Sequence, residues 1–249
     1  MKALITGATS GIGRDIARYL ASKKIELILV GRNTNSLNSL KKELMTKVST
    51  YQIDLNNDID INKLLNIIKS ESIDILINGA GFGYCDYFSH YNYAKDVDMI
   101  NTNMKAFHII FKETLSMMEK KNAGYILNIA SFAGFVPGPM MATYYATKSY
   151  VLRLSEAVAY EEKKKNSNVS ISILCPGPVK TNFESVANVN FHMKALESEY
   201  VAKYAIDKMF KKKLVIIPGV RMKISKLLLK IVPKRIQLFI FYRMQSVRK

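Results

Sequence analysis

Residues 2–13 read Lys2-Ala3-Leu4-Ile5-Thr6-Gly7-Ala8-Thr9-Ser10-Gly11-Ile12-Gly13. A short apolar run leads into a glycine-rich turn, and an amphipathic stretch follows over residues 14–23, so the order is strand, turn and helix. In this arrangement Gly7 allows the tight turn, Gly11 lets the backbone approach a pyrophosphate, and Gly13 lets the helix pack closely on the sheet.

The turn also has the electrostatics of a phosphate site. A helix N-terminus presents free N–H groups and the positive end of the helix dipole to an anion. The spacing is Gly-x3-Gly-x-Gly, which differs from the Gly-x-Gly-x-x-Gly of the general dinucleotide fingerprint, but the strand-turn-helix context is the required one. We therefore expect a nucleotide site with contacts from Gly7, Thr9, Ser10, Gly11, Ile12 and Gly13.

Strands and helices are predicted to alternate along the remaining chain. Apolar runs predict buried strands at residues 2–6, 25–30, 48–53, 73–77, 124–130, 169–175 and 214–217. Amphipathic patterns predict helices near residues 11–23, 34–46, 60–70, 95–121, 143–165 and 198–212.

This alternation is typical of an α/β single-domain Rossmann fold, with a doubly wound parallel seven-stranded sheet and helices on both faces. Right-handed crossovers predict the strand order 3-2-1-4-5-6-7, with the ligand crevice at the carboxyl ends of the strands. A chain of 249 residues without an internal linker suits one such domain. We expect residues 1–219 to form it and residues 220–249 to be a helical extension packed on or beside it.

A tyrosine and a lysine are placed for proton transfer. Tyr144 and Lys148 are four residues apart on a predicted helix and therefore project from one face. Since an ammonium favours a phenolate beside it, the pKa of Tyr144 is expected to fall from about 10 towards the working pH. Tyr145 serves as an internal comparison, because its own i+4 residue is the uncharged Ser149. The spacing alone also suits a solvated lysine beside a packed tyrosine, so it depends on the other motifs.

Six motifs occur in one order: Thr6-Gly7-x3-Gly11-x-Gly13, Asn78-Gly79-Ala80-Gly81, Asn103, Ser131, Tyr144-x3-Lys148 and Pro176-Gly177-Pro178-Val179-Lys180-Thr181. In order and spacing they resemble the short-chain dehydrogenase/reductase family, within it an NADP-preferring bacterial-type subgroup with a basic C-terminal tail. The resemblance covers residues 2–219. It implies an NADP-dependent oxidoreductase acting on CH–OH and C=O groups, and a homo-oligomer that is a dimer or a tetramer.

The resemblance also implies catalytic roles. Tyr144 would donate the proton to the alkoxide, and Lys148 would lower the pKa of Tyr144 and hold the nicotinamide ribose. Ser131 would hydrogen-bond the carbonyl oxygen. Asn103 would support a water that links Lys148 to bulk solvent. Asn101 is a second candidate for this position, but the residues after Asn103 match the family pattern better.

The cofactor is expected to be NADP(H). Gly31 stands where NAD-type members of the family carry an acidic residue, and the guanidinium of the next residue, Arg32, suits a 2′-phosphate. Two plainer interpretations stay open: Arg32 as a surface charge and Asp54 as a turn or cap residue. Further cofactor contacts implied by the resemblance come from Asn33, Asp54, Leu55, Asn78, Ala80, Gly81, Tyr144, Lys148, Pro176, Gly177, Val179 and Thr181.

The substrate side is expected to be apolar. Residues 182–197 correspond to the family's mobile lid and carry Phe183, Val186, Val189, Phe191, Met193 and Leu196. An opposite wall is predicted from Phe135, Val136, Met140 and Met141. Such a wall suits a small-molecule carbonyl or alcohol with an acyl, lipid or steroid-like body, unless these side chains simply pack against the domain.

The C-terminus departs from the rest of the chain in charge. Residues 208–249 hold thirteen Lys and Arg and no Asp or Glu, so they leave only +4 of the total of +17 to residues 1–207. Apolar-basic segments at 221–232 and 234–244 are divided by Pro233 and are each too short to span a bilayer. Three interpretations stay open for residues 220–249: a peripheral membrane contact, a cap on the substrate pocket, or a subunit contact. Nucleic-acid binding is not expected, because no binding motif accompanies the charge.

The cysteines and histidines predict neither a disulfide nor a metal site. Cys85 and Cys175 form no CxxC, and His90, His108 and His192 lack ligand spacing. No signal peptide is expected before the first strand. We therefore expect a cytoplasmic protein, which would lie at the inner face of a membrane if the tail binds one.

Two function classes compete with the reductase. One is an NADPH-binding sensor with little turnover, and the other is a membrane-surface scaffold whose reductase activity is secondary. The presence of Ser131, Tyr144 and Lys148 favours the enzyme.

Overall fold

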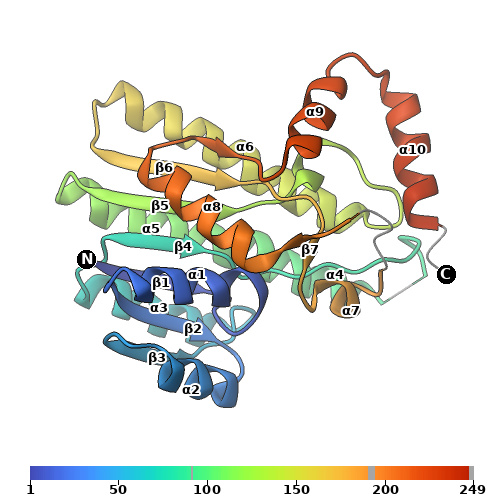
Figure 1. The fold of residues 1–249 in the computed structure, drawn as a ribbon. Helices are drawn as coiled ribbons and strands as arrows, with labels where there is room; N and C mark the ends of the chain where they lie inside the picture. Colours follow the sequence, from blue (N-terminus) through green and yellow to red (C-terminus); the bar gives the residue numbers. More distant parts are fainter. Residues whose placement is uncertain (91, 190–193, 247–249) are drawn as a thin grey trace.

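Within residues 1–90, 92–189 and 194–246, which are those that the computed structural model describes, seven strands form one parallel sheet (Figure 1). Their order, β3-β2-β1-β4-β5-β6-β9, is the predicted 3-2-1-4-5-6-7. The strands are β1 (Lys2–Thr6), β2 (Glu26–Gly31), β3 (Val48–Gln52), β4 (Ile75–Asn78), β5 (Gly124–Ile129), β6 (Val169–Leu174) and β9 (Val215–Ile216). Each predicted strand is present, with its ends shifted by at most a few residues.

Helices cover both faces of the sheet, as predicted. One face packs against α1 (Gly11–Ser22), α2 (Thr34–Glu43) and α8 (Ser198–Phe210). The other packs against α3 (Asp58–Ser70), α5 (Phe107–Lys120) and α6 (Ala142–Lys164).

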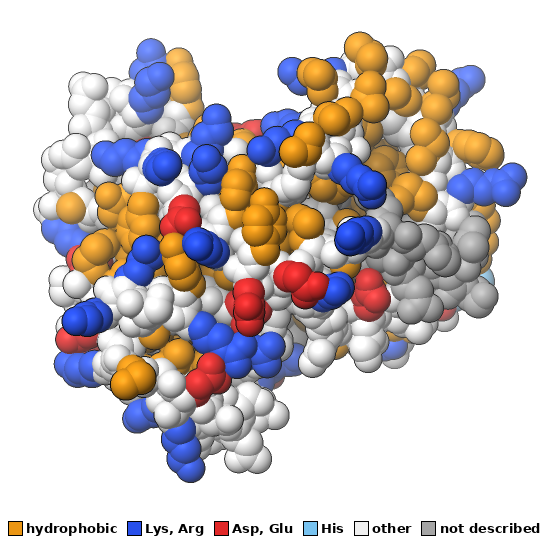
Figure 2. All heavy atoms as spheres, in the orientation of Figure 1, with side chains coloured by type: hydrophobic (Ala, Val, Ile, Leu, Met, Phe, Trp, Pro, Cys, Tyr) orange, Lys and Arg blue, Asp and Glu red, His pale blue; other side chains and the backbone are white. Residues whose placement is uncertain are grey.

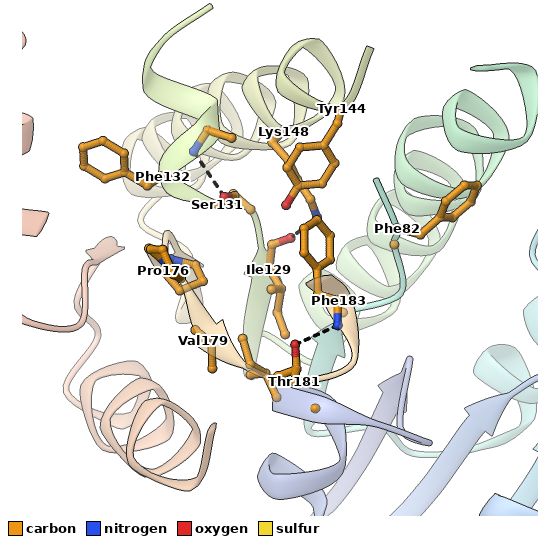
Figure 3. A pocket seen from close by; sticks show the side chains of 18 of the residues that line it. Phe82, Ile129, Ser131, Phe132, Tyr144, Lys148, Pro176, Val179, Thr181 and Phe183 are labelled. Atoms are coloured by element: carbon orange, nitrogen blue, oxygen red, sulfur yellow. Dashed lines mark hydrogen bonds between the residues drawn. The ribbon is translucent and has the colours of Figure 1, made fainter. Parts of the chain in front are cut away.

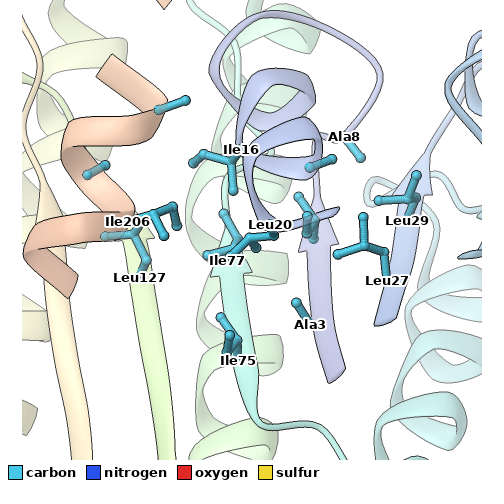
Figure 4. Packing of buried hydrophobic residues seen from close by; sticks show 14 of the residues in the cluster. Ala3, Ala8, Ile16, Leu20, Leu27, Leu29, Ile75, Ile77, Leu127 and Ile206 are labelled. Carbon is cyan, nitrogen blue, oxygen red and sulfur yellow. The ribbon is translucent and has the colours of Figure 1, made fainter. Parts of the chain in front are cut away.

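Successive side chains of each strand enter different cores. In β1, Ala3 and Ile5 join the cluster under α1 and α8, which Figure 4 shows, while Leu4 joins the cluster under α3 and α5. All three are fully buried. A strand buried on both sides needs a continuous apolar run, which explains why the strands could be located from the sequence.

One predicted helix is interrupted. The segment predicted as a single helix over residues 95–121 is α4 (Tyr93–Ile100), a π-helical turn η1 (Asn101–Ala106) and α5. A π-turn widens the helix by one residue per turn and is common at functional sites. The polar residues of this turn, with Asn103 among them, are thereby reoriented relative to the two α-helices.

The remaining elements lie beyond the carboxyl ends of the strands. They are the 3₁₀-helix η2 (Phe132–Phe135), β7 (Val179–Lys180), α7 (Phe183–Ala187), β8 (Leu196–Glu197), α9 (Val220–Leu228) and α10 (Lys234–Ser246). β7 and β8 pair in a separate two-stranded sheet that the sequence analysis did not predict. In Figure 1 the strand arrows point towards the side of the molecule where α7, α9 and α10 stand. None of the helices in the described residues is long and apolar enough to cross a membrane.

Candidate active site

A cavity of about 580 Å³ opens at the carboxyl edge of the sheet. It runs from the turn after β1, past the ends of β4 and β5, to the C-terminal helices. The predicted residues that line it are Gly7, Thr9, Ser10, Gly11, Ile12, Gly13, Arg32, Asp54, Leu55, Ala80, Gly81, Ser131, Tyr144, Lys148, Pro176, Gly177, Val179 and Thr181.

Two predicted cofactor contacts are not among the lining residues. Asn33 caps the N-terminus of α2, where its side chain accepts a hydrogen bond from the Ser36 N–H at 2.9 Å. Asn78 is buried behind the cavity wall. Its amide nitrogen donates to the Phe107 carbonyl at 3.0 Å, and its oxygen accepts from the Thr6 hydroxyl at 3.3 Å. Both side chains therefore stabilise the backbone around the cavity.

The glycine turn has the geometry that a pyrophosphate contact needs. Gly7 and Gly11 have φ values of +71° and +52°, which side chains rarely adopt. A Cβ on Gly7 would lie 3.0 Å from the backbone of Ala80, and one on Gly13 would collide with the Gly7 carbonyl oxygen. A Cβ on Gly11 would lie 2.8 Å from the Thr181 methyl group. Glycine at these positions keeps the backbone N–H groups at the start of α1 open to the cavity, so the turn fits a dinucleotide phosphate.

The far end of the cavity bears on the choice of cofactor. A Cβ on Gly31 would lie 2.6 Å from the Thr9 methyl group, so Thr9 occupies the space in which an acidic side chain would begin. Arg32 is exposed at the cavity wall and forms no hydrogen bond or ion pair with any residue that the structure describes. A free guanidinium is therefore available there.

Asp54 is a turn residue at the cavity wall, and its contact with a cofactor stays a prediction. It lines the cavity, and one of its carboxylate oxygens accepts a hydrogen bond from the Asn56 N–H at 3.0 Å, as in an Asx turn.

Tyr144, Lys148 and Ser131 converge on one point of the cavity wall (Figure 3). Tyr144 and Lys148 come from successive turns of α6, and Ser131 follows β5 as the N-cap of η2. The Ser131 hydroxyl hydrogen-bonds the phenol of Tyr144 and also accepts from the Ala133 N–H at 3.1 Å. Phe183 of α7 lies against Tyr144, with ring centroids 5.3 Å apart. The hydroxyl groups of Ser131 and Tyr144 are thus held together beside the aromatic ring of Phe183.

The prediction that the pKa of Tyr144 falls is wrong, because in the structure this pKa is raised. Burial raises the pKa of Tyr144, and the hydrogen bond from Ser131 opposes this only in part. Burial also lowers the pKa of Lys148 to about 8. The Lys148 ammonium donates to the Ile129 carbonyl at 3.0 Å rather than to the phenol. Sequence spacing placed the two side chains on one face, but it carried no information on how deeply they are buried.

Asn103 lies next to Lys148 without lining the cavity. It is 1% exposed, its amide donates to the Phe82 carbonyl at 2.8 Å and to the Thr147 hydroxyl at 3.1 Å, and its oxygen accepts from the Phe82 N–H. A Cβ on Gly81 would lie 2.9 Å from the Asn103 oxygen and 3.3 Å from the Lys148 nitrogen. The two polar atoms therefore face the same small space, which the π-turn helps Asn103 to reach.

The predicted substrate walls are only partly present. From the lid, Phe183 and Val186 line the cavity, whereas Val189 packs in a buried cluster with Cys85 and Ala187. From the opposite wall, Met141 lines the cavity and Phe135, Val136 and Met140 do not. Phe191, His192 and Met193 lie outside the described residues.

The C-terminal helices form the missing wall. Residues 220–246, which we call the roof hairpin, contribute Met222, Ser225, Leu228, Leu229, Val232, Gln237, Ile240, Phe241, Met244 and Gln245 to the cavity lining. Gln237 holds the turn between α9 and α10, because its amide donates to the Leu229 and Val232 carbonyls at 2.9 and 2.7 Å. Of the three interpretations of the tail, a cap on the pocket therefore describes its inner face.

Tyr145 anchors the end of this roof. The amide of Gln245, which is 2% exposed, donates to the Tyr145 hydroxyl at 2.7 Å, and the ring of Phe241 lies 6.3 Å from that of Tyr145. From the sequence, Tyr145 served only as a comparison for Tyr144. A contact between residues 100 positions apart leaves no local pattern from which it could have been found.

The sequence of the chain is similar to those of known oxidoreductases. Residues 1–190 match the family model described as short chain dehydrogenase. The chain is 30% identical over 202 residues to an uncharacterized oxidoreductase of Staphylococcus epidermidis, which covers 80% of this chain and 86% of that one. It is 32% identical over 224 residues to dehydrogenase/reductase SDR family member 11 of Bos taurus, with 82% and 88% covered. It is also 36% identical over 171 residues to a very-long-chain 3-oxoacyl-CoA reductase of Pyrenophora tritici-repentis, with 64% and 50% covered.

Solved structures share the fold. A short-chain dehydrogenase from Sphingobium yanoikuyae in complex with NADPH has a TM-score of 0.84 and 26% identity, with 92% of each chain covered. A short-chain dehydrogenase/reductase from Burkholderia phymatum in complex with NAD has a TM-score of 0.82 and 22% identity, with 90% and 91% covered. Proteins of this fold are thus found with either nicotinamide cofactor.

Because Lys148 is buried, we expect its side-chain amine to titrate at a lower pH than a solvated lysine. Because burial penalises the ammonium, Lys148 should lose its proton near pH 8 in the protein without cofactor, instead of near 10.5, and should still be mostly charged at pH 7. The measurement is a pH titration of labelled lysine side chains by NMR, with the Lys148 signal assigned from its loss in Lys148→Met. A midpoint at or above 10.5 would show that the amine is better solvated than its position implies.

Proposed function

Because the chain belongs to the short-chain dehydrogenase family, we propose that it is an NADPH-dependent oxidoreductase that interconverts a carbonyl group and a secondary alcohol on an apolar small molecule. One observation carries the proposal: the glycine turn and the group formed by Ser131, Tyr144 and Lys148 line the same cavity. A cofactor held by its phosphates at the turn would extend along the carboxyl edge towards these three side chains.

The cofactor would be held by residues at three places along the cavity. The N–H groups of the turn after β1 would bind the pyrophosphate, Arg32 the 2′-phosphate, and Thr181 the nicotinamide end. When bound, NADPH supplies a hydride to the carbonyl carbon of the substrate. The Cβ contacts of the glycines and the free guanidinium support this assignment.

The chain's own groups would handle the proton. Ser131 would donate a hydrogen bond to the carbonyl oxygen, and Tyr144 would give its phenolic proton to the same oxygen as negative charge develops there. Lys148, whose pKa of about 8 keeps it charged at neutral pH, would stabilise the resulting phenolate. The polar space that Asn103 and Lys148 share above Gly81 would hold the water that returns a proton.

An apolar substrate is supported by the chemistry of the lining. Among the described lining residues the charged side chains are Arg32, Asp54 and Lys148, and the roof hairpin contributes none. Aromatic and methionine side chains such as Phe82, Met141 and Phe241 line the remaining wall. One relative is named a very-long-chain 3-oxoacyl-CoA reductase, which favours an acyl or lipid-like body for the substrate.

The proposal extends to the partners of the chain and to its location. We propose a homo-oligomer, a dimer or a tetramer, since the family commonly assembles in this way. We also propose a peripheral membrane contact through residues 220–249 of a protein that is otherwise cytoplasmic.

Replacing the two adjacent tyrosines tests the assignment of the proton donor. Tyr144→Phe should reduce turnover by ~10²–10⁴-fold and leave NADPH affinity nearly unchanged, because it removes only the transferred proton. Tyr145→Phe should be far milder, since it removes the acceptor of one roof hydrogen bond. The measurement is steady-state NADPH oxidation over a panel of ketones, with cofactor affinity from calorimetry. A larger loss in Tyr145→Phe would contradict the proposed register.

The cofactor preference is tested by titrating NADPH and NADH separately at one ionic strength. NADPH should bind at least about tenfold tighter, a difference of about 1.4 kcal/mol. Arg32→Ala should remove most of this preference without weakening NADH. Lys42→Ala, an exposed cation on the neighbouring helix that does not line the cavity, is the matched control. Equal affinities in the unmodified protein would make Arg32 a surface charge only.

A further inference from the structure

The outer face of the roof hairpin is apolar as well as its inner face. Of the 22 large hydrophobic side chains that are exposed in the described residues, ten lie in the 27 residues of the hairpin. Figure 2 shows hydrophobic side chains interspersed with Lys and Arg over the part of the molecule where Figure 1 places α9 and α10. Exposed apolar side chains gathered in this way usually mark an interaction surface.

The exposed side chains on α9 have helical spacing. Val220, Ile224, Leu227 and Ile231 recur at intervals of three and four residues, which places them in one stripe along α9 and the turn that follows it. Leu227 is 65% and Ile231 76% exposed, and none of the four lines the cavity. The stripe therefore points away from the substrate side.

α10 carries apolar side chains on both of its faces. Gln237, Phe241, Met244 and Gln245 turn towards the cavity, at intervals of four, three and one residues. Ile236, Leu238 and Phe239 are exposed on the outside, and Phe239 is 59% exposed. A helix that caps a pocket needs only its inner face to be apolar, so the outer face has no explanation within the described chain.

The charge of the hairpin indicates what covers this face. The hairpin carries seven Lys and Arg and no acidic residue. Six of them form no ion pair with any residue that the structure describes: Arg221, Lys223, Lys226, Lys230, Lys234 and Arg235. Two copies joined through this face about a twofold axis would bring together twelve positive charges that have no ion-pair partner among the described residues, which opposes self-association. An anionic surface satisfies both the apolar stripe and the charges.

We propose that the outer face of the roof hairpin docks on an anionic lipid bilayer. Leu227, Ile231 and Phe239 would enter the boundary between headgroups and acyl chains, while the lysine and arginine heads would stay at the phosphates. Because the same two helices line the cavity, docking would place the cavity roof at the bilayer surface, and an apolar substrate would enter from the lipid. This last step rests on the proposed function, whereas the docking surface does not.

Co-sedimentation of the full chain with vesicles tests the docking surface. The unmodified protein should bind vesicles of phosphatidylcholine with phosphatidylglycerol and bind phosphatidylcholine alone at least about tenfold more weakly. The double variant Leu227→Ser, Ile231→Ser should lose about tenfold or more in binding to the anionic vesicles. Met45→Ser, Ile59→Ser is the matched control, because these side chains are 96% and 68% exposed outside the hairpin.

A second pair of variants separates charge from apolar contact. Lys230→Glu, Lys234→Glu should weaken binding to the anionic vesicles, and Lys41→Glu, Lys42→Glu on α2 should do so much less. Equal binding of the hairpin variants and their controls would overturn the proposal, as would no binding of the unmodified protein. A lipid-free dimer, seen by sedimentation velocity and dissociated by Leu227→Ser, Ile231→Ser, would also overturn it in favour of a second copy.

Substrate entry is tested by presenting ketones in two ways. A short ketone dissolved in water should be reduced at the same rate by the unmodified protein and by Leu227→Ser, Ile231→Ser. A long-chain ketone held in anionic vesicles should be reduced more slowly by the variant. Equal rates on the vesicle ketone would overturn the entry route. No NADPH oxidation with either ketone would refute the proposed function and the entry route together, and it would leave the docking surface to the sedimentation result.

Discussion

Thr6 ties the two halves of the sheet together at the point where the winding reverses. At the end of β1 its hydroxyl donates to the Asn78 side chain and accepts from the N–H groups of Gly79 and Ala80 at the end of β4, at 3.0 and 3.2 Å. This joins the turn after β1 to the turn after β4. The crevice between the two turns is where the cavity begins, so the position of the site follows from the pairing of β1 with β4.

The parts that could be predicted from the sequence are those that local patterns specify. Strands that are buried on both faces must be apolar runs, so the order of the sheet could be predicted. A glycine turn between a strand and a helix can be recognised wherever it occurs, so the place of Gly7, Gly11 and Gly13 in the cavity lining could be predicted as well. The rest depends on contacts between distant segments. The Tyr145–Gln245 hydrogen bond, the β7–β8 pair and the π-turn at Asn103 have no signature of their own. The raised pKa of Tyr144 depends on burial, which residue spacing does not report.

The C-terminal hairpin links the cavity to the outer surface. Its charge was visible in the sequence, but the charge alone left a membrane contact, a cap and a subunit contact open. The structure separates the two faces of α10: Phe241 and Gln245 turn inward, while Phe239 is exposed. A single pair of helices can therefore close the cavity on one side and present apolar and basic side chains on the other. This explains why residues 220–246 contain so few positions that are polar and uncharged.

The proposed function requires hydride transfer in the cavity from NADPH to a ketone. Its most direct test uses NADPH that carries deuterium at the transferable position of the nicotinamide ring, with mass spectrometry of the alcohol formed from an apolar ketone. We expect one deuterium on the carbinol carbon with the unmodified protein and almost none with Tyr144→Phe. Tight NADPH binding without deuterium in the alcohol, across a panel of apolar ketones, would contradict the proposed function and favour a cofactor-binding protein with little turnover.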